Sequence, residues 1–291
     1  MKLCEKIEQK KFIITSEIAP PKGTNVEELI HELEPLKGMV DAINVTDQQS
    51  SVMKTGSLAT CHLLKKSGFE PVFQLTCRDR NRIALQSDLL SASVLGVENV
   101  LLLTGDHQKL GDHPDAKGVF DLDSVTLIQA AKGLQDGKDM KGNALAGAPK
   151  FCIGAVVNPG ADPIEPEIIK MEKKIASGAQ FFQTQAVYDI GLFMNFLEAS
   201  KHLKTTVLAG IVMLKSAGMA KYMNENVAGV IVPDNLIQEM KDAPKEERPK
   251  KSVEITIRLV KELKDLCQGI HIMSLGWDKH IPDILKGAGL A

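Results

Sequence analysis

Residues 99–120, NVLLLTGDHQKLGDHPDAKGVF, decide which class of fold the sequence indicates. The stretch opens with an apolar run at 100–103, which is too short for a buried helix and branched enough for a buried strand. The run ends at Thr104-Gly105-Asp106, and a long polar loop leads to a helical pattern near Asp123. A carboxylate at a strand end, followed by a long loop, is typical of sites in α/β proteins. Asp106 is therefore a candidate site residue, although Gly-Asp is also ordinary turn chemistry.

The same alternation of strand and helix repeats along the rest of the chain, with no long structureless linker. The predicted strands are 12–18, 42–45, 71–75, 100–103, 151–157, 181–184, 206–212 and 270–273. The predicted helices are 24–37, 57–66, 79–95, 123–135, 165–176, 190–202, 217–225, 235–241, 253–266 and one after Pro282. Eight alternations in 291 residues predict one domain, 1–291, with an α/β fold of the (β/α)8 TIM-barrel type. A doubly wound open sheet is the alternative, disfavoured because no GxGxxG follows the first strand.

Composition excludes several classes of protein. The formal net charge is −2, aromatic residues make up 4%, and basic residues are scattered among acidic ones, so nucleic acid is not expected as a ligand. No apolar run reaches membrane-spanning length, and the N-terminus lacks the apolar core of a signal peptide. The five cysteines are far apart, without a CxxC pair, which favours the cytoplasm and disfavours a zinc site. The charged run 242–251 is predicted to be a solvated surface loop.

A barrel carries its active site at the C-terminal ends of its strands. Glu17 is the sharpest candidate there, because it ends an apolar strand beside Pro20 and Pro21, and burial disfavours a carboxylate anion. A shielded carboxyl can deliver a proton near neutral pH; the alternative is a structural ion pair with a lysine. No HExxH, P-loop or Ser-His-Asp order is present, so no metal site is expected. The polar residues predicted at the strand ends are Glu17, Thr46, Gln74, Thr76, Thr104, Asp106, Asn158, Gln185 and Ser274.

Four motifs at these strand ends resemble those of 5,10-methylenetetrahydrofolate reductases. They are SEIAPP at 16–21, QLTCRD at 74–79, LTGD at 103–106 and GAQFFQTQ at 178–185. The resemblance runs from about residue 11 to 287 and covers the catalytic barrel without the regulatory domain of animal forms. The stretches LTCRDRNR at 75–82 and TGDHQKLGDHPDAKGVFD at 104–121 are similar to those of the reductases of anaerobic acetogens and of the reductase half of bacterial enzymes fused to a homocysteine methyltransferase. The resemblance implies a flavin-binding (β/α)8 barrel, which agrees with the strand count.

The resemblance also implies a reaction: a reduced flavin transfers hydride to 5,10-methylenetetrahydrofolate and yields 5-methyltetrahydrofolate. Glu17 matches the family's general acid, and Asp106 matches the aspartate near the flavin and the pterin. An anion at Asp106 suits a developing cation and tunes the flavin's electron affinity. Gln185 matches the amide that holds the folate, since a neutral donor and acceptor suit a pterin edge.

For the cofactor, the resemblance implies FAD, with FMN as an alternative. Gln74, Asn158 and Asp162 stand where the family often has histidine, tyrosine and histidine. Thr104 replaces a frequent arginine, and Phe120 a frequent tyrosine. These changes bear on the adenine half of the cofactor. The implied cofactor contacts are Thr46, Gln74, Thr104, Gly105, Asp106, Phe120, Asp121, Asn158, Asp162 and Lys174.

The reductant is left open between NADH and a protein electron donor. After the seventh predicted strand the family often carries a stacking phenylalanine, whereas residues 214–217 read LKSA. Losing such a contact weakens nicotinamide binding by about 1 kcal/mol. An iron–sulfur partner is therefore expected as a possible donor, in a homo- or hetero-oligomer, with its cluster on another subunit because this chain has no cluster motif. The alternatives are a folate-binding or catalytic subunit that works only with that partner, a flavin-free nicotinamide-dependent barrel reductase and, last, a barrel lyase.

Overall fold

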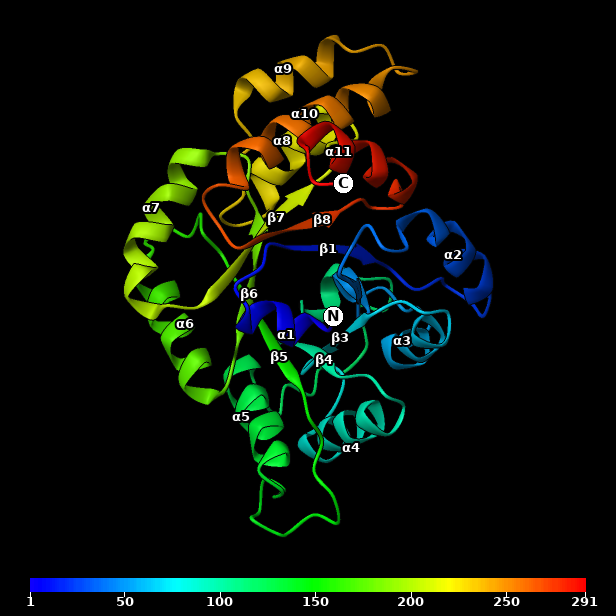
Figure 1. Ribbon diagram of the computed structural model, residues 1–291, viewed down its shortest axis with the longest axis vertical. Coiled ribbons are helices and arrows are strands. Elements are labelled where there is room, and N and C mark those ends of the chain that lie inside the picture. Colours follow the sequence, from blue (N-terminus) through cyan, green and yellow to red (C-terminus); the bar gives the residue numbers. More distant parts are fainter.

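A closed barrel of eight parallel strands, in the order β1 to β8, forms the centre of the computed structural model, which describes residues 1–291 (Figure 1). The strands are β1 (Ile13–Ile18), β2 (Ala42–Val45), β3 (Pro71–Thr76), β4 (Asn99–Leu103), β5 (Cys152–Val157), β6 (Phe181–Ala186), β7 (Thr206–Val212) and β8 (Gly269–Met273). Strand β8 pairs with β1, with Met273 opposite Glu17, and so closes the barrel. The predicted TIM-type barrel is confirmed, and the open sheet is excluded.

Helices surround the barrel (Figure 1). Several begin at a side-chain cap, as at Asn81, whose side chain accepts hydrogen bonds from the backbone nitrogens of Ile83 and Ala84. None of the helices combines the length with the apolar character needed to cross a bilayer. The outer helices are α2 (Val26–Glu32), α3 (Ser57–Lys66), α4 (Arg82–Val94), α5 (Ser124–Gln135), α6 (Glu165–Ser177), α7 (Ile190–Ser200), α8 (Ala217–Asn226), α9 (Asp234–Asp242), α10 (Arg248–Leu263) and α11 (Ile281–Ala288).

Two parts of the chain differ from the sequence prediction. The charged run 242–251 is not all loop, because α10 begins at Arg248 and carries a proline in its first turn, where a missing N–H is tolerated. Helix α1 (Leu3–Glu8) was not predicted. It is too short to show a periodic pattern, and it forms because Leu3 is completely buried in the apolar cluster inside the barrel.

The inside of the barrel changes from apolar to polar along the strands. Because alternate side chains of a strand point inward, residues two apart form successive layers. The first layer, at the N-terminal end, is an apolar cluster of Leu3, Ile13, Ala42, Val72, Leu101, Cys152, Phe181 and Leu208. The next layer is polar and buried, and contains Thr15, Asn44, Gln183 and His271.

Hydrogen bonds across the barrel hold this polar layer together. Asn44 Nδ2 donates to Gln183 Oε1 at 2.7 Å, and Gln183 Nε2 donates to Asn44 Oδ1 at 3.1 Å and to Thr15 Oγ1 at 3.3 Å. Buried polar groups with such partners fix one arrangement of the interior. The layer therefore forms a rigid floor under the C-terminal mouth of the barrel.

Candidate active site

A cavity of about 370 Å³ opens at the C-terminal ends of the strands, where a barrel is expected to carry its site. Its wall includes side chains from β1, β3, β6 and β8 and from the loops after β2 and β4. No aromatic side chain lines it. The predicted site residues in this wall are Glu17, Thr46, Gln74, Thr104, Gly105, Asp106, Asn158, Lys174 and Gln185.

Glu17 lies inside β1, with only 11% of its side chain exposed. Its carboxylate accepts a hydrogen bond from Gln74 Nε2 at 2.9 Å and another from Gln49 Nε2 at 3.3 Å. The structural lysine partner considered from the sequence is not formed; the ionisable side chain within 4 Å is His271, whose Nε2 lies 3.6 Å from Glu17 Oε2. Glu17 is therefore a shielded carboxyl held by two amides and one imidazole.

His271 is a site residue that the sequence reasoning missed. Its ring is 3% exposed, with Nδ1 2.9 Å from Thr15 Oγ1 and Nε2 on the side of Glu17. The ring thus links a hydroxyl in the barrel interior to the carboxyl at the mouth. Strand alternation could have found it, since His271 stands two residues after the strand's first residue and must share the inward face.

Asp106 differs from Glu17 in its surroundings. It lies in the loop after β4, is exposed, and its carboxylate makes no hydrogen bond or ion pair. The preceding Gly105 has φ +92°, and a Cβ there would lie 3.1 Å from the Cβ atoms of Thr76 and Arg78. Only glycine suits both this conformation and this close approach. The turn that delivers Asp106 to the cavity therefore depends on Gly105.

Lys174 lies on the β5 side of the cavity. It is 2% exposed on α6, and its Nζ donates to the carbonyl oxygen of Val156 at 2.6 Å. Burial lowers the pKa of Lys174 to about 8. Lys170 and Ser124, the first residue of α5, line the same region. A helix N-terminus and two amines make this side suited to an anionic group.

Gln185 reaches the cavity from β6. The pairing of β6 with β7 shifts register between Gln183 and Ala186, which marks an irregularity at Gln185. Its Oε1 accepts from the backbone nitrogen of Ala186 at 3.0 Å, while its Nε2 has no protein acceptor. The side chain is therefore fixed at one end and offers an N–H donor at the other.

Three predicted cofactor residues lie outside the cavity wall. Phe120 is 38% exposed, and Asp162 is exposed. Asp121 accepts hydrogen bonds from Arg82, with Nη2 to Oδ1 at 2.7 Å, and this contact lowers the pKa of Asp121 to about 2. The structure does not bring these side chains together with Glu17 and Asp106.

Comparison with known proteins identifies the group that this chain resembles. Residues 2–289 match the family model of methylenetetrahydrofolate reductase. Methylenetetrahydrofolate reductase 2 of Schizosaccharomyces pombe is 26% identical over 238 residues, which are 74% of this chain and 35% of that protein. The 5,10-methylenetetrahydrofolate reductase of Pectobacterium carotovorum is 23% identical over 198 residues, which are 65% of this chain and 59% of that protein. The chain thus spans less than two thirds of either relative.

Among solved structures, an uncharacterized protein from Clostridium thermocellum shares the fold. It is described as binding two copies of 5-methyl-5,6,7,8-tetrahydrofolic acid. The two chains superpose with a TM-score of 0.66 at 18% identity, covering 98% of this chain and 97% of the other.

Proposed function

The chain belongs to the methylenetetrahydrofolate reductase family, and on that premise we propose that it reduces 5,10-methylenetetrahydrofolate to 5-methyltetrahydrofolate with a bound flavin. The observation that carries the proposal is one cavity whose wall holds a shielded carboxyl, Glu17, and an unpaired anion, Asp106. Opening of the folate's imidazolidine ring needs a proton donor and produces a cation. Glu17 can give the proton, and Asp106 can stabilise the cation.

The cavity fits a flavin in the chemistry of its wall. Thr46 Oγ1 is buried there without a hydrogen-bond partner, which an edge of the isoalloxazine ring would satisfy. Lys174 and Lys170 suit the phosphate. When bound, the flavin would supply the hydride. We take the cofactor to be FAD, with FMN as the alternative because Phe120 and Asp162 lie outside the wall.

Glu17 is proposed to be the general acid. As a neutral acid it gives its proton to N10 of the folate, which opens the imidazolidine ring and leaves an N5 iminium cation. The amides of Gln49 and Gln74 then donate to the carboxylate that forms. His271 lies between Glu17 and Thr15, where its ring helps to hold the Glu17 carboxyl in place at the mouth of the barrel.

Asp106 and Gln185 are proposed to bind the folate. The Asp106 carboxylate has no cation of its own, so its charge is available to the iminium cation. The unpartnered Nε2 of Gln185 can donate to an acceptor on the pterin edge.

A second candidate function is that of a subunit reduced by a partner protein, such as an iron–sulfur protein, in place of NADH. It is favoured because no aromatic side chain lines the cavity. Trp277 does not line the cavity either, and Lys215 Nζ lies over its ring, 5.2 Å from the centroid. We propose that the protein works in the cytoplasm as a homo- or hetero-oligomer.

The absorption spectrum of the purified protein tests the proposal, with mass analysis of the released cofactor. Flavin bands and oxidation of the bound flavin by methylenetetrahydrofolate are expected. If the protein were colourless and still oxidised NADH in the presence of methylenetetrahydrofolate, the flavin would be ruled out, and direct hydride transfer from NADH would take its place. Flavin that is reduced by a partner protein but not by NADH would favour the second candidate.

A further inference from the structure

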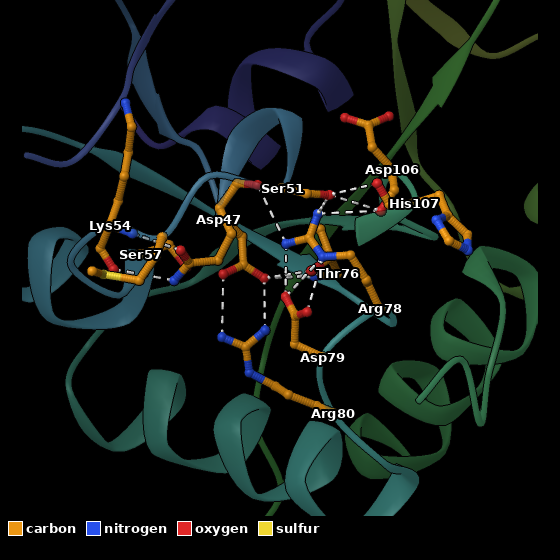
Figure 2. A network of polar contacts seen from close by, with 12 residues as sticks. Asp47, Ser51, Lys54, Ser57, Thr76, Arg78, Asp79, Arg80, Asp106 and His107 are labelled. Carbon is orange, nitrogen blue, oxygen red and sulfur yellow. Dashed lines mark hydrogen bonds and ion pairs between the residues drawn. The ribbon is translucent and has the colours of Figure 1, made fainter. Parts of the chain in front are cut away.

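The loops after β2, β3 and β4 meet in a polar network that the chemistry above does not use (Figure 2). Its centre is Arg78, which is 2% exposed and follows β3. Arg78 Nη1 donates to Ser51 Oγ at 3.0 Å and to the carbonyl oxygen of Asp106 at 3.4 Å. Its Nη2 donates to the carbonyl oxygen of Gln48 at 3.3 Å and to Asp79 Oδ2 at 2.7 Å. One buried guanidinium thus contacts all three loops.

Ser51 completes the contact with the loop after β4. Its Oγ lies 3.0 Å from the carbonyl oxygen of Asp106 and 3.1 Å from that of His107, so that its one hydroxyl hydrogen is shared between these two acceptors. We call the two side chains, Ser51 and Arg78, the Ser51–Arg78 clamp. The clamp holds the backbone of Asp106 and leaves its side chain free.

The clamp therefore acts on Asp106 through its backbone, which sets the position of its Cα and the direction of its Cα–Cβ bond. Figure 2 shows that the carboxylate points away from Arg78 and that no polar contact reaches it. An unpaired carboxylate on a mobile loop would sample many positions, whereas one on a fixed backbone is restricted to the few that rotation of its own side chain allows beside the cavity.

The same turn also reaches Glu17. Ser51 ends the short 3₁₀ helix Gln49–Ser51, and Gln49 Nε2 donates to Glu17 Oε1 at 3.3 Å. Gln48, Ser50 and Ser51 have φ of 51°, 54° and 59°, a strained conformation that persists only where surrounding contacts hold it. One strained turn thus contacts both proposed catalytic residues: Gln49 bonds to the Glu17 carboxylate, and Ser51 bonds to the backbone of Asp106.

We propose that the Ser51–Arg78 clamp is a positioning device that fixes Asp106 relative to Glu17, so that both act on one bound folate. The inference rests on the proposed function. Arg80, two residues further on, shows the contrast: its guanidinium donates to Asp47 and pairs with Asp88, and it makes no contact with the loop of Asp106.

The test is a double-mutant cycle on the holoenzyme, with Ser51→Ala, Asp106→Asn and the double variant. Ser51→Ala should lower kcat/KM for the folate about tenfold, because a misplaced group costs rate without loss of the fold. In the Asp106→Asn background the same change should cost less than about twofold, because coupled residues are not additive. Ser200→Ala is the matched control, since Ser200 Oγ is buried and donates to the carbonyl oxygen of Phe196 at 2.8 Å, far from the cavity.

Hydrogen exchange on the ligand-free protein gives a second measurement. Amides of residues 104–111 should exchange faster in Ser51→Ala than in the parent, and at the parent rate in Ser200→Ala. Arg78→Met should show both effects more strongly, and if it does not fold, Ser51→Ala decides alone. An unchanged kcat/KM in Ser51→Ala, or an equal loss in both backgrounds, would overturn the proposal. Failure of the proposed function would be visible earlier, as parent protein without flavin or folate turnover.

Discussion

The two ends of the barrel interior differ although the same strands build both. At the N-terminal end the inward side chains are apolar and close-packed, and the ring of Phe181 occupies the space that a side chain at position 154 would need. At the C-terminal end they are amides, hydroxyls, His271 and Glu17, joined by hydrogen bonds around a cavity. The difference shows that one period of strand alternation separates residues of the apolar core from the residues to which we assign the chemistry.

The largest expected effect comes from the polar end. Glu17→Gln should lower the rate of folate reduction on the order of 10³-fold, because the amide has no acidic proton to give. It keeps the shape of the side chain, so flavin content and the free energy of unfolding should change little. Rapid mixing of reduced enzyme with methylenetetrahydrofolate measures the rate. Glu225→Gln, on the exposed face of α8, is the control.

If Glu17→Gln lost its flavin or failed to fold, Glu17 would have a structural role, like the residues of the buried polar layer beneath it. The comparison between the two ends would then fail at its most informative position.

Substitutions at the apolar end should change the free energy of unfolding but not the kinetics of folate reduction. Phe181→Ala should lower the free energy of unfolding by about 4 kcal/mol, because it leaves a cavity in a close-packed layer. KM for the folate should stay within about twofold, since the buried polar layer separates Phe181 from the cavity. Urea unfolding of the purified variant measures the first quantity, and steady-state kinetics the second. A raised KM with unchanged stability would contradict the division.

The strands and the strand-end residues could be predicted from the sequence, because both depend on local patterns. Apolar runs indicated all eight strands, and the residues at or just after the C-terminal ends of these strands included Glu17, Asp106 and Gln185, which share one cavity wall. Assigning chemical roles to these three needed the family resemblance. Those roles remain predictions.

Contacts between distant loops could not be predicted in this way. Ser51 and Arg78 are 27 residues apart, and nothing local in either loop indicates that they meet. His271 was not predicted because the site was sought at the last residues of the strands, whereas His271 stands two residues before the end of β8. Helix α1 depends on the burial of Leu3 inside the finished barrel, which is a property of the tertiary structure.

Lys174 offers a test on pH. Its pKa is about 8 in the folded protein, below its value of 10.5 in the unfolded chain. Between these values the unfolded state binds more protons, so stability rises with pH there and the cost of burying the cation is fully present below pH 8. Relative to Lys174→Met, the ligand-free parent should gain about 2 kcal/mol from pH 8 to 9.5. Chemical denaturation at several pH values measures this, and a constant difference would contradict a desolvated amine.

The smallest expected effect is at Gln185, where the polar end offers a single neutral donor. Gln185→Ala should raise KM for the folate about fivefold, since one neutral hydrogen bond contributes about 1 kcal/mol. The half-reaction with the electron donor should keep its rate, because the donor does not need the pterin contact. Gln238→Ala, on α9 where Nε2 donates to Asp242, is the matched control. Equal losses of rate in both half-reactions would indicate that Gln185 contacts the cofactor and not the folate. The polar end would then offer no amide that binds the substrate alone.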